Sequence, residues 1–211
     1  MSSDFLREIL FYSKLLHKNG LVSSTDGNIS LKYEKGFLVT PSGFPKRELK
    51  KKDIVKIDEE GNIISKSPTS EIKLHLEIYK VRKDVSAVVH SHPPFTTALS
   101  LVDFDFNEIP LSEFFITLQK VSTVGYKEPG SRALALEVAK QFKAKETRAV
   151  VLKNHGAVTI GVSLKEAYYR MESLEHSSKI YFIAKLLGSP KSFSKDLQRR
   201  LILIGKNYHI K

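Results

Sequence analysis

Two histidines, His90 and His92, stand one residue apart at the end of an apolar run and are followed by two prolines. Alternate side chains of a strand share a face, so both imidazoles would project together while Ser91 projects from the opposite face. The prolines favour a strand that ends here or lies at a sheet edge. Paired imidazoles at this spacing suit Zn²⁺, although such a pair alone is also compatible with ordinary surface or core histidines.

A third histidine, His155, could complete such a site. It lies 63 positions after His92 (155 − 92), between two apolar runs and directly before Gly156. A catalytic zinc commonly takes three protein ligands and keeps one position open. His155 is therefore the best third candidate, although a single histidine at a strand end is more often a surface or satisfied core residue.

Two other histidines are weaker candidates. His75 follows Glu71 by four residues on a predicted helix, so the two side chains share a face. The segment EIKLH is not the HExxH zinc motif, which favours a core or supporting role for His75. His176 lies among glutamates in a long predicted helix, and we expect it on a solvated face.

Three segments rich in small and hydroxyl-bearing residues, TDGNIS, TPSGFP and PTSE, could bind an anion. Backbone N–H groups at a helix N-terminus favour anions, and hydroxyl groups add donors. The residues that could together hold a phosphate are Asn28, Ser42, Gly43, Thr69 and Ser70. Glu71 would then lie beside both phosphate and metal, where it could act as a general acid/base. Each segment is also compatible with an ordinary turn or helix cap.

The hydrophobic spacing predicts the elements that position these residues. Helices are expected over residues 4–19, 68–82, 133–142, 163–188 and 194–205. Strands are expected over 27–33, 36–43, 86–92 and, as a pair bent around Asn154, 149–161, with a hairpin over 53–65. Strands and helices mix without a strict βαβ rhythm, which predicts an α/β protein whose sheet is at least partly antiparallel and covered by helices.

Composition narrows the class of protein. At 211 residues, with 41% hydrophobic and 27% charged residues, the chain fits one soluble domain over 1–211. The absence of cysteine excludes disulfides, thiolate ligands and cysteine nucleophiles. The amphipathic N-terminus lacks a signal-peptide core, and no apolar run approaches the roughly 20 residues of a membrane helix. We therefore expect a cytoplasmic protein with no membrane partner.

The formal net charge of +11 permits two interpretations. A nucleic-acid-binding protein would be basic, but so would a lysine-rich protein that attracts an anionic small molecule. The basic residues are scattered, with one cluster at KRELKKKD, and no nucleic-acid-binding motif accompanies them. The second interpretation is favoured, with no nucleic-acid partner expected.

Five motifs together resemble the class II aldolase/adducin family. In chain order they are GNIS (27–30), TPSG (40–43), TSE (69–71), AVVHSHPP (87–94) and NHG (154–156). Within this family the chain is most similar to the L-fuculose-1-phosphate aldolase branch. The resemblance implies a three-layer α/β/α fold with a mostly antiparallel sheet, one Zn²⁺ per chain, and a homotetramer whose active sites lie between neighbouring subunits.

The resemblance also implies a reaction and residue roles. The implied reaction is cleavage or formation of a ketose 1-phosphate through a dihydroxyacetone phosphate enediolate and a short aldehyde. The implied zinc ligands are His90, His92 and His155. Glu71 is implied as the acid/base, and as a further ligand when substrate is absent. The implied phosphate contacts are Asn28, Ser42, Gly43, Thr69 and Ser70.

Tyrosines are where the chain departs from this branch. The branch uses a tyrosine of a neighbouring subunit as a proton donor, and Phe114 is aligned with it here. A phenyl ring cannot donate a proton, so water or the nearby Tyr126 would have to replace it. A second family tyrosine matches Tyr208 in the C-terminal tail, which is also compatible with a tail residue of no catalytic role.

Three alternatives remain within the resemblance. An L-ribulose-5-phosphate 4-epimerase tends to carry aspartate at the position of Glu71. A methylthioribulose-1-phosphate dehydratase would accept this glutamate. A non-catalytic adducin-like scaffold would be expected to lose the histidines, all three of which are present.

Overall fold

The computed structural model describes residues 2–64 and 67–207 of the chain. Its strands form a seven-stranded sheet in the order β3-β2-β1-β4-β7-β6-β5. The strands are β1 (Asn28–Tyr33), β2 (Gly36–Val39), β3 (Val55–Asp58), β4 (Ala87–Ser91), β5 (Lys120–Val124), β6 (Thr147–Leu152) and β7 (Gly156–Gly161). The pair β5–β6 is parallel and the other neighbours are antiparallel, which confirms the predicted mostly antiparallel sheet.

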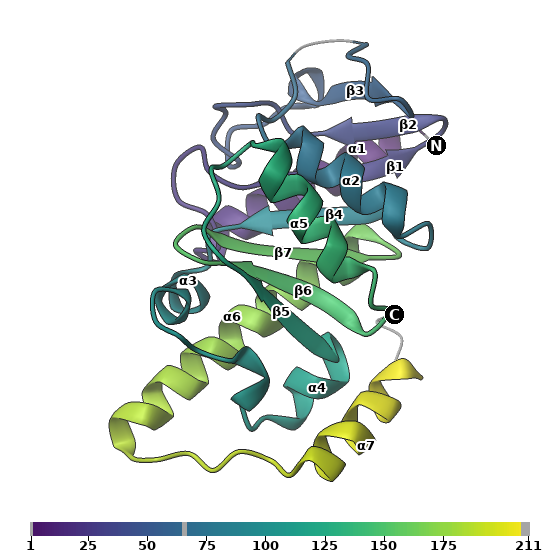
Figure 1. The fold of residues 1–211 in the computed structure, drawn as a ribbon. Helices are drawn as coiled ribbons and strands as arrows, with labels where there is room; N and C mark the ends of the chain where they lie inside the picture. Colours follow the sequence, from purple (N-terminus) through teal and green to yellow (C-terminus); the bar gives the residue numbers. More distant parts are fainter. Residues whose placement is uncertain (1, 65–66, 208–211) are drawn as a thin grey trace.

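Helices cover both faces of this sheet (Figure 1). They are α1 (Ser2–Lys18), α2 (Ile72–Val81), α3 (Pro94–Ser100), α4 (Ser112–Leu118), α5 (Arg132–Phe142), α6 (Leu164–Leu187) and α7 (Lys195–Lys206), with single 3₁₀ turns at Lys51–Asp53 and Phe106–Glu108. In Figure 1, α2 and α5 lie in front of the sheet, and α1 and α6 lie behind it. The predicted three-layer α/β/α arrangement is therefore confirmed.

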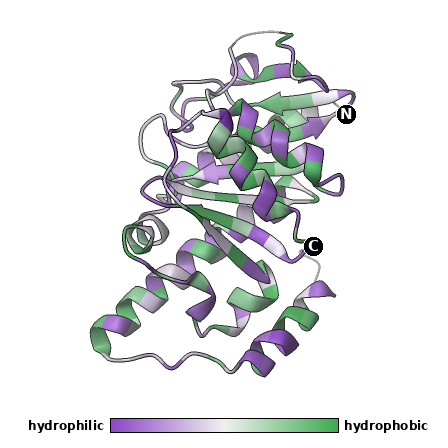
Figure 2. Ribbon diagram, viewed as in Figure 1, coloured by the Kyte–Doolittle hydropathy of each residue, from purple (hydrophilic) through white to green (hydrophobic). Residues whose placement is uncertain are grey.

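Two hydrophobic cores follow from the alternation of side chains along the strands. Val88 and Val158 point into the core shared with α2 and α5. Val89 and Ala157, one position away, belong to the core shared with α1, α4 and α6. The covering helices accordingly show both hydrophobic and hydrophilic residues along their length in Figure 2. Among the described residues, no helix combines the length and apolar character needed to cross a membrane.

Three elements were not predicted from the sequence: α3, α4 and β5. The prolines that end β4 also begin α3, because Pro94 occupies its first turn, where a missing N–H costs no hydrogen bond. Helix α4 ends at Gln119, whose φ of 55° is left-handed, a conformation that glycine usually signals. The expected hairpin over 53–65 is reduced to β3 and one isolated bridge between Ile57 and Ile63.

The strand register brings the chemically interesting residues to one end of the sheet. Asn28 at the start of β1 pairs with His90 near the end of β4. Ser91 pairs in turn with Ala157 of β7, so the β6–β7 turn that carries His155 lies beside the end of β4. Ser91 and Ala157, which are 66 positions apart in the sequence (157 − 91), are thus neighbours in the sheet.

Candidate active site

His90, His92 and His155 form a compact cluster at the end of β4 and the β6–β7 turn. Each offers a ring nitrogen, and these three nitrogens all lie within 4.8 Å of one another. The Nε2 atoms of His90 and His92 are 3.1 Å apart, as expected for side chains on the same strand face. The structure therefore brings together the three histidines that the sequence analysis singled out.

The far sides of two of these rings are fixed by oxygen atoms. The carbonyl of Ala157 lies 3.0 Å from Nδ1 of His90 and must accept its proton, so Nε2 is the nitrogen of His90 that faces the cluster and Glu71. Nδ1 of His92 lies 3.3 Å from a carboxylate oxygen of Asp26. Asp26 is itself held by the backbone N–H of Ser23 at 2.8 Å. Such outer partners orient metal-binding imidazoles and fix their tautomer.

Sequence reasoning missed Asp26. It lies within the TDGNIS segment, whose interpretation rested on small residues and hydrogen-bond donors. An acidic residue two positions before a predicted phosphate contact was the available signal, but only the fold places it against His92.

Glu71 lies directly before α2, with its carboxylate turned towards the histidines. Oε2 is 2.9 Å from Nε2 of His90 and accepts a hydrogen bond of 3.1 Å from Nδ2 of Asn28. Oε1 is 3.8 Å from Nε2 of His155 and accepts no hydrogen bond, although it is buried. Nδ1 of His155 is likewise buried without a hydrogen-bond partner among the described residues. Unsatisfied ligand atoms in such a cluster fit a site built for a cation.

The charge states of the cluster suit that interpretation. Burial raises the pKa of Glu71, but the charge and hydrogen bond of His90 outweigh it, so the net pKa of this carboxyl is lowered and it is ionised at neutral pH. Burial, followed by the charge of His90, lowers the pKa of His92 to about 4. Burial lowers the pKa of His155 to about 4 in the same way. Two neutral imidazoles beside a carboxylate are a donor set that binds divalent metals.

The predicted phosphate-binding residues line one cavity of about 190 Å³ together with Glu71, His92 and His155. Its lining comprises Thr25, Asp26, Gly27, Asn28, Pro41, Ser42, Gly43, Thr69, Ser70, Glu71, His92, Pro129 and His155. Gly43 has a φ of +66°, so its turn requires a left-handed residue. The three segments that looked like ordinary turns in isolation therefore converge on one concave site.

Lys46 is a buried residue that links two of these loops, TDGNIS and TPSGFP, by hydrogen bonds. Its ammonium group donates to the carbonyl of Thr25 at 3.1 Å and to that of Phe44 at 3.0 Å. Only 1% of Lys46 is exposed, and this burial, opposed by the charge of Asp26, lowers its pKa to about 8. Sequence reasoning missed Lys46, because one buried lysine cannot be distinguished by sequence from its many exposed neighbours.

The structure describes two of the three residues considered for the role of the family tyrosines, Phe114 and Tyr126. Phe114 is fully buried in the chain's own core, packed edge-on against Phe115, so its ring does not reach the surface. Tyr126 is 64% exposed. Tyr208 lies outside the described residues, so its predicted catalytic role stays a prediction.

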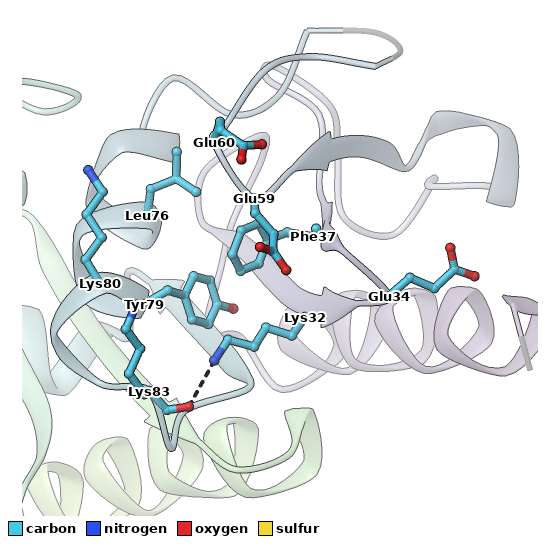
Figure 3. A pocket seen from close by; sticks show the side chains of 10 residues that line it. Lys32, Glu34, Phe37, Glu59, Glu60, Leu76, Tyr79, Lys80 and Lys83 are labelled. Atoms are coloured by element: carbon cyan, nitrogen blue, oxygen red, sulfur yellow. Dashed lines mark hydrogen bonds between the residues drawn. The ribbon is translucent and has the colours of Figure 1, made fainter.

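A larger cavity, of about 320 Å³, lies between β1, β2 and α2 (Figure 3). It is lined by Lys32, Glu34, Gly36, Phe37, Glu59, Glu60, Leu76, Tyr79, Lys80 and Lys83. No histidine lines it, and its charged residues include both lysines and glutamates, so it has no single predominant charge. The chemistry of the side chains therefore identifies the smaller cavity as the candidate active site.

Comparison with known proteins defines the family. Residues 7–182 match the Class II Aldolase and Adducin N-terminal domain. The chain is 35% identical to the L-fuculose phosphate aldolase of Methanocaldococcus jannaschii, over 86% of this chain and 97% of that protein. It is 32% identical to the 5-deoxy-D-ribulose 1-phosphate aldolase of Bacillus thuringiensis serovar kurstaki, over 92% of each chain. A solved structure of an L-fuculose 1-phosphate aldolase superposes with a TM-score of 0.87 at 31% identity, over 98% of each chain.

This chain belongs to the class II aldolase/adducin family. The family predicted from five short motifs is thereby confirmed, as is the three-layer fold that the resemblance implied.

Proposed function

We propose that this protein is a zinc-dependent aldolase that cleaves or forms a ketose 1-phosphate, with dihydroxyacetone phosphate and a short aldehyde as the fragments. One observation carries the proposal: the histidine cluster and the ionised Glu71 share a cavity with three hydroxyl-rich loops. Two of the similar proteins are named as an L-fuculose 1-phosphate aldolase and a 5-deoxy-D-ribulose 1-phosphate aldolase, which supports this substrate class.

In this proposal His90, His92 and His155 hold one Zn²⁺ per chain, and Glu71 turns towards it when substrate is absent. Bound zinc supplies a Lewis acid that stabilises negative charge on the oxygens of the enediolate fragment. Glu71, ionised and buried, removes or returns the proton at the enediolate carbon.

The loops of the cavity hold the phosphate away from the reacting bond, which orients the substrate. The proposed contacts are Asn28, Ser42, Gly43, Thr69 and Ser70. The side chain of Asn28 already donates to Glu71 and contacts His75, so one N–H of its amide is left for this purpose.

The reaction also needs a group that donates a proton to the oxygen of the aldehyde fragment. We propose a homotetramer in which a neighbouring subunit completes each site. Tyr208 is a proposed catalytic residue, and water or the exposed Tyr126 replaces the tyrosine that is missing at Phe114. Light scattering of the purified protein would establish the mass of the assembly, and a monomer with full activity would contradict a shared site.

The decisive experiment incubates the protein with a panel of ketose phosphates, including L-fuculose 1-phosphate and 5-deoxy-D-ribulose 1-phosphate. Release of dihydroxyacetone phosphate is the expected result. Isomer formation without release would instead indicate an epimerase, loss of water a dehydratase, and inertness towards the whole panel a scaffold.

Three variants test the residue roles in the same assay. His92→Ala should abolish cleavage together with zinc binding, and Glu71→Gln should reduce turnover sharply while zinc stays bound. His176→Ala, an exposed histidine on α6, is the matched control and should leave both unchanged. Undiminished turnover in His92→Ala would exclude that residue as a ligand.

A further inference from the structure

We propose that His75 is a positioning residue: it fixes the side-chain amide of Asn28 so that an N–H group of Asn28 always faces the carboxylate of Glu71. The consequence for turnover rests on the proposed function, in which Glu71 is the acid/base. The orientation itself rests on a buried chain of hydrogen bonds that begins at Tyr79 and ends at Glu71.

This chain of hydrogen bonds joins one face of α2 to one face of β1. Glu71, His75 and Tyr79 are spaced four residues apart, so their side chains stack along one side of the helix and its start. Asn28 and Ser30 are two apart on β1 and therefore share a strand face. The two sets face each other.

All four links are within hydrogen-bonding distance, and the two to the ring of His75 are short. Tyr79 Oη lies 2.8 Å from Ser30 Oγ, and Ser30 Oγ lies 2.6 Å from Nδ1 of His75. Nε2 of His75 lies 2.5 Å from Oδ1 of Asn28. Nδ2 of Asn28 lies 3.1 Å from Oε2 of Glu71, which completes the chain.

The carboxylate of Glu71, which only accepts, determines the direction of the hydrogen bonds from this end of the chain. An ionised carboxylate only accepts, so Asn28 must present its NH₂ group to Glu71 and its carbonyl oxygen to His75. That oxygen also only accepts, so Nε2 of His75 must carry a proton. In a neutral ring Nδ1 is then an acceptor, to which the hydroxyl of Ser30 donates. The hydroxyl of Tyr79 donates to Ser30 in turn, with Oγ at 2.8 Å and the carbonyl oxygen at 3.1 Å as its acceptors.

Burial keeps His75 neutral and excludes water from this chain of hydrogen bonds. His75 and Ser30 are fully buried, and Asn28 and Tyr79 are almost so. Burial, with the charge of His90 adding to it, lowers the pKa of His75 to about 3. Without water as a competing partner, each link depends on the next, and an unpaired group would be costly.

The far end of the chain is also held in place. The ring of Tyr79 stacks on Phe37 with centroids 4.5 Å apart, and the ammonium of Lys32 lies 5.4 Å from its centroid. Figure 3 shows this arrangement at the larger cavity, where Lys32 reaches the carbonyl oxygen of Lys83. The ring of Tyr79 is thus fixed in place, and with it the far end of the hydrogen-bond chain.

If His75 loses its donor, the carbonyl oxygen of Asn28 is left buried without that partner, and only the hydrogen bond to Glu71 still holds the amide in place. The hydrogen bond that stabilises the charged form of Glu71 would be less well oriented, and the position of Glu71 relative to the metal-binding histidines would no longer be fixed. We expect kcat to fall by roughly 10- to 100-fold, while KM for the sugar phosphate and zinc content stay close to wild type.

The test compares His75→Leu with His75→Gln, because glutamine can donate to Asn28 and accept from Ser30. His75→Leu should show the loss in kcat, and His75→Gln should recover most of it. Lys73→Ala, an exposed change on the same helix, is the matched control. Wild-type kcat in His75→Leu, or no recovery in His75→Gln when both are folded and zinc-loaded, would overturn the proposal.

A second measurement does not depend on activity or on how the variants fold. The ¹⁵N chemical shifts of histidine-labelled wild-type protein distinguish the two neutral tautomers of His75. The expected form carries its proton on Nε2, and a proton on Nδ1 would overturn the proposal. Because this reading is independent of turnover, failure of the whole ketose-phosphate panel would refute the proposed function without affecting it.

Discussion

Gly156 stands where the two metal-binding segments touch, and Gly156→Ala should therefore disrupt the site without removing any ligand. A Cβ at this position would lie 2.3 Å from the carbonyl oxygen of Ser91 and 2.8 Å from Cδ2 of His92. Ordinary van der Waals contact begins near 3.4 Å, so the two segments must separate by between about half an ångström and one ångström. Metal–ligand distances tolerate roughly 0.2 Å.

The expected result has two parts. Overpacking of this kind costs about 1–3 kcal/mol of unfolding free energy. The displacement of His92 relative to His155 should also lower zinc affinity by roughly 10- to 100-fold, comparable to the loss of an orienting partner of a metal ligand.

Zinc affinity is measured by competition with a chromophoric chelator, and stability by urea unfolding of metal-free protein. Gly125→Ala is the matched control, because a Cβ there meets nothing within 4 Å. A folded Gly156→Ala protein with wild-type zinc affinity would refute the argument that these two segments set the geometry of the site.

Two further predictions concern groups around the cavity. Asp26→Asn should weaken zinc binding by about 10- to 100-fold, because the amide cannot supply the charge that Asp26 places 3.3 Å from Nδ1 of His92, and unchanged affinity in the chelator assay would contradict this role. Lys46 is protonated below its pKa of about 8 and neutral above it, so KM for the sugar phosphate should rise as the pH passes 8 in the wild type. In Lys46→Met, KM should already be raised at pH 7 and should not rise further as the pH passes 8. Lys51→Met, which changes an exposed lysine, is the control and should behave as wild type. A rise in KM near pH 8 that persists in Lys46→Met would show that another group causes it.

Local patterns predicted much of the fold, because they report on faces and ends of elements. The long helix α6 follows Ser163, whose hydroxyl accepts from the N–H of Glu166, so it begins within one residue of the helix predicted over 163–188. The alternation that placed His90 and His92 on one face of a strand is confirmed by the distance between them. Helices α3 and α4 were not predicted, since a proline pair and a left-handed glutamine do not signal a helix start or end unambiguously.

In the candidate site, too, some residues could be recognised from local sequence and others could not. The types of its ligands were readable, because an HxH pair, a histidine before glycine and a glutamate at a helix start each carry a local signature. Two of their partners were not, because Asp26 and Lys46 acquire their roles from burial and from neighbours distant in sequence. A supporting role was expected for His75, but its hydrogen-bond partners were not.

The sequence by itself determined which residues could bind a metal and an anion, and through their order it indicated the family. Only the tertiary structure decided that these residues meet. Pairing of β1 with β4 and of β4 with β7 brings Asn28, His90 and the turn of His155 to one end of the sheet. Burial there removes water, and the loss of water lowers the pKa of His92 and His155, so that a set of ordinary side chains becomes a site for a metal ion.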